Sequence, residues 1–402
     1  RNVIRDTIQK SLEDNKKQNM KLDILMEVYI DIKMNIVENK EAINDFIDCV
    51  IEISDSVNSD NWNGEDVMGI FFNEFNRYKK KSESGQVFTP DHITSLMYKI
   101  LEVNANDKIL DAACGSGAFL VKSMSNMIKE VGGINTKEAK KIKEHSLFGI
   151  EFDREIFALA CANMMIHKDG KTNLEQLDSR DKEASEWIKS KGITKVLMNP
   201  PFERKYGCKK IVENVLNSVP SGIKCAFIMP EKKMEKDKMG KLLEKHHLEA
   251  IIKLPEKLFD AGVTTSIYVF ETGKKQVGEI YGCYIEDDGL ERVKNQGRQD
   301  IKDKWMELEN YWVDSIRKRN DTKYGTSQWI DPKKFLSYQK PKAEFVLYEE
   351  DFVKTMMNYL MFKNKIDVKE FSDKLINKTL YNSEILKEDN NIVIKIKDAE
   401  DE

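Results

Sequence analysis

Asn199, Pro200, Pro201 and Phe202 form a segment whose side chains suit chemistry on an amino nitrogen, and they follow the apolar run 195–198. Acceptor oxygens from the Asn199 side chain and the Pro200 carbonyl could hold both N–H bonds of a planar exocyclic amino group. Proline has a fixed φ and no N–H, so two prolines present carbonyls in a stiff turn. The Phe202 ring could stack on a base flipped out of a duplex. Alignment and electrostatics would supply the rate without a metal or a covalent nucleophile.

A glycine-containing loop lies upstream, at the end of another apolar run. Residues 111–120 read Asp-Ala-Ala-Cys-Gly-Ser-Gly-Ala-Phe-Leu. Gly115 and Gly117 permit a tight turn and a close approach of the backbone to a nucleoside cofactor. Leu120 stands where a dinucleotide-binding loop would have its third glycine, so that fingerprint is weak. Asn-Pro also starts ordinary turns, but its place behind this loop favours methyl transfer onto an amino nitrogen.

Acidic residues end the next two predicted strands. Glu151 follows Gly149 and Ile150, and a carboxylate at that point can accept hydrogen bonds from ribose hydroxyls. Asp153 better suits the start of a helix, where a negative charge interacts favourably with the helix dipole. Asp178 could accept a hydrogen bond from the amino group of an adenine ring. We therefore expect Glu151 and Asp178 to contact the cofactor.

Strands and helices alternate between residues 85 and 273, which predicts a doubly wound, largely parallel sheet. Ligands bind such sheets at the carboxyl ends of the strands, and the Asn199 segment, the glycine loop and the acids all lie at such ends. The predicted strands are 108–111, 147–151, 174–178, 196–199, 226–230, 250–254 and 266–271.

The flanking regions have different patterns. Residues 1–63 contain neither Gly nor Pro and show helical spacing of apolar residues. Gly and Pro are also absent after Pro341. Trp305, Trp312 and Trp329 are expected to pack a small helical domain rather than to stack on bases. We predict a helical domain at 1–84, a catalytic domain at 85–275 and a mainly helical extension for partner contact at 276–402.

Composition restricts the class of protein. The chain has 402 residues, 40% of them hydrophobic and 33% charged, as expected for a soluble protein with several domains. No apolar run reaches membrane-spanning length, and the first thirty residues lack the apolar core of a signal peptide. The six cysteines form no Cys-x-x-Cys pair, so we expect no metal site, no disulfide framework and a cytoplasmic location. Arg1 in place of Met is typical of a trimmed chain or of part of a longer polypeptide.

Taken in order, the motifs resemble those of the S-adenosylmethionine-dependent N6-adenine DNA methyltransferases, in particular the modification subunits of type I restriction-modification systems. The resemblance covers roughly residues 65–271 and fades after 275. The matching segments are 85–90 (Gly-Gln-Val-Phe-Thr-Pro), 111–120, 149–153, 199–202 and 259–266 (Phe-Asp-Ala-Gly-Val-Thr-Thr-Ser).

This resemblance implies a class I methyltransferase fold, with a mostly parallel seven-stranded sheet, and S-adenosyl-L-methionine as cofactor. The implied cofactor-binding residues are Gln86, Phe88, Thr89, Pro90, Asp111, Gly115, Ser116, Gly117, Glu151 and Asp178. The implied catalytic residues are Asn199, Pro200, Pro201 and Phe202. Among them, Glu151 would hold the ribose and Asp178 the adenine of the cofactor, while Asn199 and Pro200 would grip the target amino group. Cys114 lies inside the loop and is interpreted as structural.

The expected partners follow from the same resemblance. The net charge is −4, whereas a protein that binds DNA alone usually has a basic face. We therefore expect double-stranded DNA to be bound together with a specificity subunit or a linked target-recognition region, and a restriction subunit where a nuclease accompanies the enzyme. No membrane partner is expected. Cytosine-N4 methylation, protein glutamine N5-methylation and a binding role without activity stay open as alternatives, although Asn199 favours adenine and segments 85–90 and 259–266 disfavour glutamine.

Overall fold

The computed structural model describes residues 40–70, 89–167, 173–202, 207–235, 240–256, 258–259, 263–293, 297–341, 348–381, 383–388 and 391–396. The chain divides into two compact units, Arg1–Gln339 and Lys340–Glu402. Gln86 and Phe88 lie outside the described residues, as do 1–39 of the predicted N-terminal helical region.

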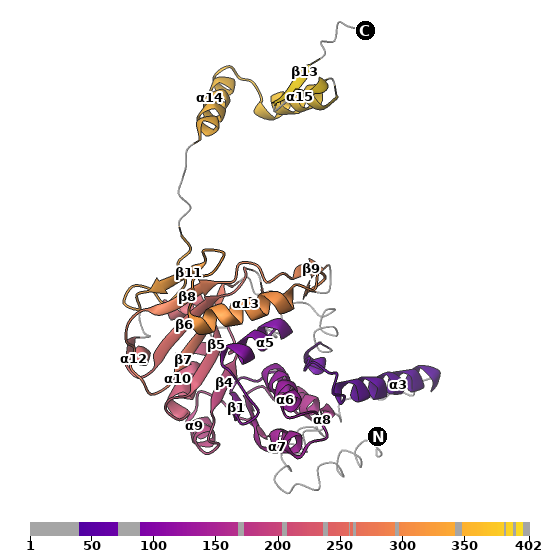
Figure 1. Ribbon diagram of the computed structural model, residues 1–402, viewed down its shortest axis with the longest axis vertical. Helices are drawn as coiled ribbons and strands as arrows, with labels where there is room; N and C mark the ends of the chain where they lie inside the picture. The colour runs from indigo at the N-terminus through magenta and orange to yellow at the C-terminus, as the bar shows by residue number, and fades with distance from the viewer. Residues whose placement is uncertain are drawn as a thin grey trace. The chain divides into compact units, whose positions relative to one another are not determined.

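A nine-stranded sheet forms the centre of the first unit (Figure 1), in the order β11-β8-β6-β7-β5-β4-β1-β2-β3. Strands β3, β2, β1, β4 and β5 run parallel, whereas β7 is antiparallel to both β5 and β6. At the far edge β8 is parallel to β6, and β11 is antiparallel to β8. The strand bounds are β1 Ile109–Asp111, β2 Leu147–Glu151, β3 Asn173–Gln176, β4 Lys195–Met198, β5 Lys224–Pro230, β6 His247–Lys253, β7 Thr265–Glu271, β8 Ile280–Tyr284 and β11 Ser327–Ile330.

All seven predicted strands are present, which confirms the predicted mostly parallel α/β sheet. The sheet is wider than predicted because β8 and β11 extend it. The boundary predicted after residue 275 therefore falls inside the sheet. Every residue of β8 is buried, so the strand lacks the alternation of buried and exposed positions that marks a half-buried strand.

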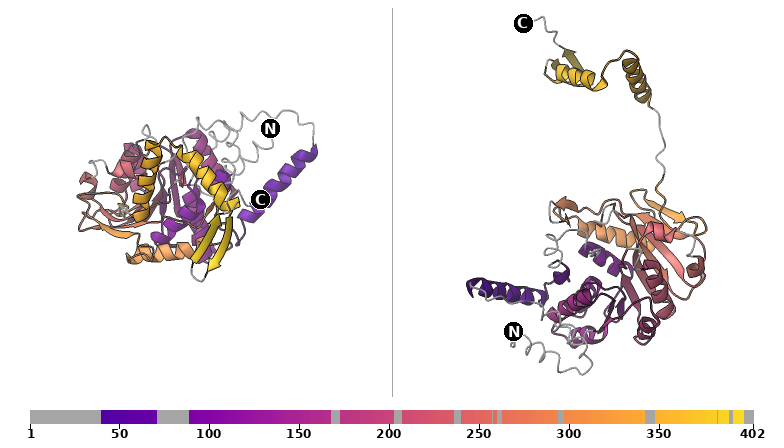
Figure 2. Two further views of the ribbon diagram at one scale, coloured as in Figure 1. Left: turned by 90° about the horizontal axis from the view of Figure 1, so that it is seen from above. Right: turned by 180° about the vertical axis from the view of Figure 1, so that it is seen from behind.

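Helices cover both faces of the sheet (Figures 1 and 2). Neighbouring residues of a strand point to opposite faces, so Leu197 of β4 belongs to one core and Val196 and Met198 to the other. The helices on the Leu197 side are α5 Asp91–Ile100, α6 Ala118–Glu130, α7 Lys137–His145, α8 Arg154–Ile166 and α13 Trp305–Lys318. Those on the other side are α9 Lys182–Lys189, α10 Cys208–Ser218, α11 Glu231–Met234 and α12 Gly240–Leu243.

The three tryptophans after residue 300 do not form the core of a separate helical domain, and that expectation is wrong. Trp312 of α13 is fully buried in the core that α5, α6 and α8 share. Trp305 packs against the same core, and Trp329 lies exposed on β11 with its ring edge against Tyr281. Residues 276–339 thus add Trp312 and Tyr281 to the core of the sheet, whereas Trp329 stays exposed.

The remaining elements lie at the two ends of the chain. Helix α3 Lys40–Val57 belongs to the first unit and projects from it (Figure 2), with Val50 and Ile51 exposed. The second unit contains α14 Glu349–Lys363, α15 Val368–Tyr381 and the hairpin of β12 Ser383–Glu388 with β13 Asn391–Ile396. A small hairpin of β9 Glu291–Val293 and β10 Gly297–Gln299 lies before α13. Among the helices that the structure describes, none has the length and apolar character to cross a membrane.

Candidate cofactor and catalytic site

Adjacent strands bring the predicted site residues to one edge of the sheet. Asp111 ends β1, Glu151 ends β2, and Asn199 directly follows β4. Residue Leu110 is paired with Val196 of β4 and Asp111 with Gly149 of β2, so the carboxyl ends of the three strands meet. This is the point where the strand order reverses, which is the usual ligand position in open α/β sheets.

The glycine loop turns sharply between β1 and α6. Gly115 has φ 56° and Gly117 has φ 97°, a left-handed conformation that side chains with a Cβ rarely adopt. A Cβ built on Gly115 would meet no atom within 4 Å, so space for a ligand adjoins the backbone there. The amide of Gly115 donates to Glu151 Oε2 over 3.0 Å, which ties the loop to the end of β2.

Two carboxyl groups adjoin this loop, of which Asp111 is buried and Glu151 is partly buried. Asp111 is 2% exposed and accepts a hydrogen bond from the Ala113 amide over 3.1 Å. Burial, together with the nearby charge of Glu151, raises the pKa of Asp111 to about 8. Burial also raises the pKa of Glu151, although the amides of Asp153 and Gly115 donate to its carboxylate and oppose that shift. Such a pair of acids favours a ligand that carries positive charge.

Asp178 lies just beyond β3 and is already engaged by a cation. Arg180 donates to both of its carboxylate oxygens, with Nε 2.8 Å from Oδ1, and these hydrogen bonds lower the pKa of Asp178. Arg180 also lies 5.9 Å from the centre of the Phe152 ring. That ring is 56% exposed directly after Glu151. Phe152 is not among the residues predicted from the sequence, although an aromatic residue directly after Glu151, the predicted ribose-binding residue, was an available signal.

Segment 199–202, predicted to be catalytic, makes hydrogen bonds with Thr89 and Lys233. Asn199 Nδ2 donates to Thr89 Oγ1 over 2.9 Å, so the residue that precedes Pro90 and helix α5 orients the Asn199 amide. Pro200 is buried and Pro201 partly buried. Lys233 Nζ donates to the Phe202 carbonyl oxygen. The structure therefore brings the predicted catalytic residues together with Thr89.

Phe259 and Phe202 form an aromatic pair in this segment. Their ring centres lie 5.4 Å apart at an interplanar angle of 80°, which is an edge-to-face contact. Phe259 is buried, whereas Phe202 is only partly buried. The buried ring thus supports the more exposed one from behind.

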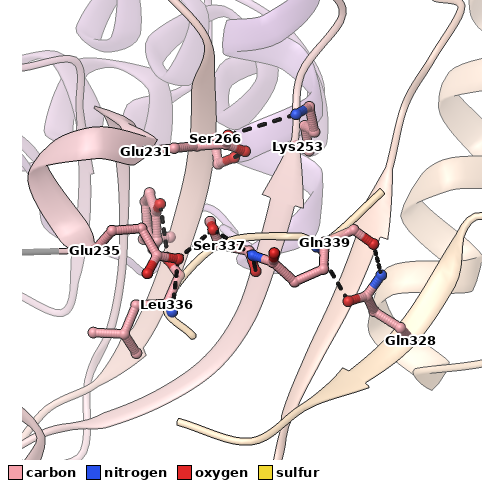
Figure 3. A network of polar contacts seen from close by, with 9 residues as sticks. Glu231, Glu235, Lys253, Ser266, Gln328, Leu336, Ser337 and Gln339 are labelled. Carbon is pink, nitrogen blue, oxygen red and sulfur yellow. Dashed lines mark hydrogen bonds and ion pairs between the residues drawn. The ribbon is translucent and has the colours of Figure 1, made fainter. Parts of the chain in front are cut away.

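Helix α11 links segment 199–202 to a polar network along the same edge of the sheet (Figure 3). Glu231 accepts a hydrogen bond from Ser266 Oγ over 2.8 Å and lies 3.5 Å from Lys253 Nζ, a cation that is 7% exposed. Glu235, one residue past α11, accepts from the Leu336 amide over 3.0 Å and from Ser337 Oγ. Segment 336–337, which the sequence predicts to be part of an extension, therefore lies against this edge.

Asp66 is a further residue that the sequence reasoning missed. Ser116 Oγ of the glycine loop donates to its Oδ2. Ser116 is only 2% exposed, and its hydroxyl is directed to Asp66. No repeat or motif spacing in the sequence relates position 66 to position 116. Within the residues described, no group of three or more His, Cys, Asp or Glu side chains could hold a metal ion.

Comparisons with known proteins agree with this geometry. Residues 63–221 match the family model described as N-6 DNA Methylase. The chain is 30% identical over 340 residues to the type II restriction enzyme and methyltransferase RM.BcgI of Heyndrickxia coagulans, a match that covers 78% of this chain and 51% of that protein. It is 24% identical over 321 residues to the type I restriction enzyme MjaVII methylase subunit of Methanocaldococcus jannaschii, covering 66% of this chain and 53% of the relative.

A solved structure shares the fold. The crystal structure of the type I restriction enzyme EcoKI M protein matches with a TM-score of 0.50 at 15% identity, covering 74% of this chain and 77% of that one. The chain spans about half the length of the two curated relatives. Residues 63–221 of this chain are thus similar to the N-6 DNA methylase family, and the chain resembles the methylase subunits of restriction enzymes.

Proposed function

We propose that this chain transfers a methyl group from S-adenosyl-L-methionine to the N6 amino group of a flipped-out adenine in DNA. The observation that carries the proposal is the Asn199 side chain, oriented by Thr89 at the end of β4 beside the glycine loop. All of these residues lie within the part of the chain that matches the N-6 DNA methylase family.

The residues of the loop fit this cofactor. S-adenosylmethionine, when bound, supplies a methyl group on a positively charged sulfur and also carries an ammonium group. The buried carboxyl group of Asp111 and the partly buried one of Glu151 suit such a cation, and the open space at Gly115 allows close approach. Glu151 would accept from the ribose, and Asp178 and Phe152 would lie along the adenine. Thr89 and Pro90, with Gln86 and Phe88 before them, would line the methionine end.

Asn199 and Pro200 would make the target nitrogen reactive. The lone pair of an adenine amino group is spread into the ring, which makes it a poor nucleophile. If Asn199 Oδ1 and the Pro200 carbonyl each accept one N–H, the nitrogen becomes more tetrahedral and its lone pair is localised. Because Asn199 Nδ2 donates to Thr89, the amide oxygen Oδ1 points away from Thr89. Phe202, supported by Phe259, would stack on the flipped base.

The partners proposed are double-stranded DNA and a specificity subunit or linked target-recognition region, with a restriction subunit where a nuclease is present. Two observations support a second subunit or region that supplies much of the contact with DNA: the description of the relatives as methylase subunits, and the net charge of −4. The domain division proposed from sequence, 1–84, 85–275 and 276–402, is revised in one respect. Because β8, α13 and β11 pack on the sheet, the proposed catalytic part extends to Gln339, and partner contact is proposed for the residues that follow.

Single-molecule sequencing of host DNA tests the proposal, with the intact gene compared with Asn199→Ala and with Asn217→Ala. Asn217 is an exposed residue of α10, so its variant controls for loss of an amide side chain elsewhere. We expect N6-methyladenine to disappear at one sequence motif only in Asn199→Ala. N4-methylcytosine lost in its place would establish the cytosine alternative. An unchanged methylome would refute the proposal, and labelled methyl transfer to cell protein would then support glutamine.

A further inference from the structure

We propose that Asp66 is a positioning residue for the cofactor loop, so that the N-terminal segment 57–69 is part of the cofactor site. The inference rests on the proposed cofactor-binding role of Gly115, Ser116 and Gly117. It assigns to a segment before the glycine loop a role that the sequence analysis did not foresee.

The contacts of Asp66 join three segments that are far apart in the sequence. Its Oδ2 accepts from Ser116 Oγ, and its Oδ1 accepts from Asn163 Nδ2 of α8 over 2.8 Å. Asn163 Nδ2 also donates to the Ser116 carbonyl over 2.8 Å. Asp66, Asn163 and Ser116 therefore form a closed set of hydrogen bonds around the loop. Because both the side chain and the backbone carbonyl of Ser116 are hydrogen-bonded, the loop is held in one backbone conformation.

The burial of these groups shows that the arrangement is enforced. Asn163 is 0% exposed, and its Oδ1 has no hydrogen-bond partner among the described residues. A buried unsatisfied oxygen costs free energy, so the amide is held this way because both acceptors lie on the side of Nδ2. The Ser116 hydroxyl donates to Asp66, so the loop presents its backbone, rather than that hydroxyl, to a ligand. The position of the backbone then depends on the carboxylate behind it.

Gly69 allows the carboxylate to reach the loop. A Cβ at this position would lie 2.2 Å from Asp66 Oδ2, closer than real Cβ atoms come, and a tight 3.0 Å from Ser116 Oγ. Only glycine leaves room for the Asp66 side chain between segment 57–69 and the loop.

The segment is attached to the catalytic sheet by contacts that do not involve Asp66. The Trp62 ring stacks on His167 with centres 4.2 Å apart and planes at 22°. Lys122 Nζ of α6 donates to the Asn63 carbonyl over 2.7 Å, and Asn58 Nδ2 donates to the Ile166 carbonyl over 2.9 Å. Removal of the Asp66 carboxylate should therefore leave the segment in place and free only the loop.

A simpler role for Asp66 is that of a helix cap, because its Oδ1 also accepts from the Gly69 amide over 2.8 Å. Serine caps helices about as well as aspartate, but its side chain is too short to reach Ser116 and Asn163 together. Asp66→Ser therefore separates the two roles. If capping is the whole role, this variant behaves like the wild type.

The test is isothermal titration of S-adenosylmethionine, and separately of S-adenosylhomocysteine, into the full chain. Asp60→Ser is the matched control, because Asp60 lies in the same segment and accepts from the Ile134 amide over 2.8 Å without touching the loop. We expect Asp66→Ser to raise the dissociation constant about tenfold, because the buried Ser116 hydroxyl and Asn163 amide lose an acceptor that they share. Asp60→Ser should stay within about twofold. Thermal unfolding of each variant checks that it is folded.

A second variant tests the pairing. Ser116→Ala removes the hydroxyl group that donates to Asp66, so it should raise the dissociation constant by a similar factor. The double variant should bind the cofactor as tightly as the single variant with the larger dissociation constant, because both changes remove the same contact. Wild-type affinity in Asp66→Ser would overturn the positioning role alone, as would equal losses in Asp66→Ser and Asp60→Ser. A wild-type chain that binds neither cofactor form would overturn the proposed function and this inference with it.

Discussion

The buried carboxyl group of Asp111 should make cofactor binding depend on pH. Its pKa is raised to about 8 by burial and by the charge of Glu151, so at pH 7 about nine-tenths of the free chains carry a proton on Asp111. The positive charge of bound S-adenosylmethionine favours the ionised form. Binding at pH 7 therefore releases up to about 0.9 proton from this group.

The expected magnitude follows from that release. Below pH 8 the affinity of the wild type should rise up to about tenfold for each pH unit, which is about 1.4 kcal/mol. Asp111→Asn keeps an acceptor for the Ala113 amide but has no proton to release. The cofactor's own ionisation affects both proteins equally, so the difference between them isolates Asp111.

Isothermal titration at pH 6, 7 and 8, in two buffers of different ionisation enthalpy, measures both the affinity and the proton release. S-adenosylhomocysteine serves as a control because it lacks the positive sulfur and should show a smaller release. Identical pH profiles for the wild type and Asp111→Asn would refute the reasoning, since they would mean that Asp111 does not change ionisation when the cofactor binds.

The same carboxyl group should affect the stability of the free protein. A raised pKa means that the folded state holds the proton more tightly than the unfolded state, where the pKa is about 3.9. Its contribution to stability is therefore fully present below pH 4 and is lost as the pH rises through about 8. Between pH 5 and pH 7 the free energy of unfolding of the wild type should fall by roughly 3 kcal/mol relative to Asp111→Asn. Urea denaturation at each pH measures this, and a constant difference would contradict it.

Other substitutions probe the loop, the sheet and the polar edge. Gly117→Asp should abolish cofactor binding in a titration, because φ 97° strains any residue with a Cβ and the new charge adjoins the buried acids; unchanged affinity would remove this glycine from the site. Gly149→Val should lower the free energy of unfolding, measured by urea denaturation, by about 2 kcal/mol, because its Cβ would lie 2.4 Å from a leucine of β3. An unchanged urea midpoint would show that β3 moves to accommodate the side chain. Glu231→Ala should cost about 3 kcal/mol in the same assay because it leaves buried Lys253 without its carboxylate, and a Glu231→Ala, Lys253→Met double variant should recover most of the loss.

Short apolar runs located most of the predicted strands, and all of those strands except the edge strand β3 are mostly buried. The same rule did not identify β8, a buried segment of five residues with Gly282 at its centre, where a glycine weakens a strand or marks a close approach of another chain segment. In the structure a Cβ on Gly282 would lie 2.5 Å from Ile330 Cδ1, so the glycine serves the packing of β11 against β8. The sequence does not distinguish a glycine that turns the chain from one that admits a neighbour.

The residues of the candidate site also divide into those that the sequence could predict and those that it could not. Residues at strand ends, such as Asp111, Glu151 and Asn199, were predictable because topology places the carboxyl ends of parallel strands together. Thr89 was predictable only through the motif that contains it. Asp66 was not, because its partners lie 50 and 97 residues away and no local pattern reports contacts of that range.

If Asp66 positions the glycine loop as proposed, the docking of segment 57–69, which Trp62 and Asp66 attach, is energetically coupled to cofactor binding. Coupling between two sites is reciprocal: a factor by which segment docking strengthens cofactor binding is the factor by which the cofactor strengthens docking. A protein that binds the exposed apolar residues of α3 would thus act on methyl transfer from outside the site. Conversely, cofactor occupancy would protect segment 57–69 from proteolysis.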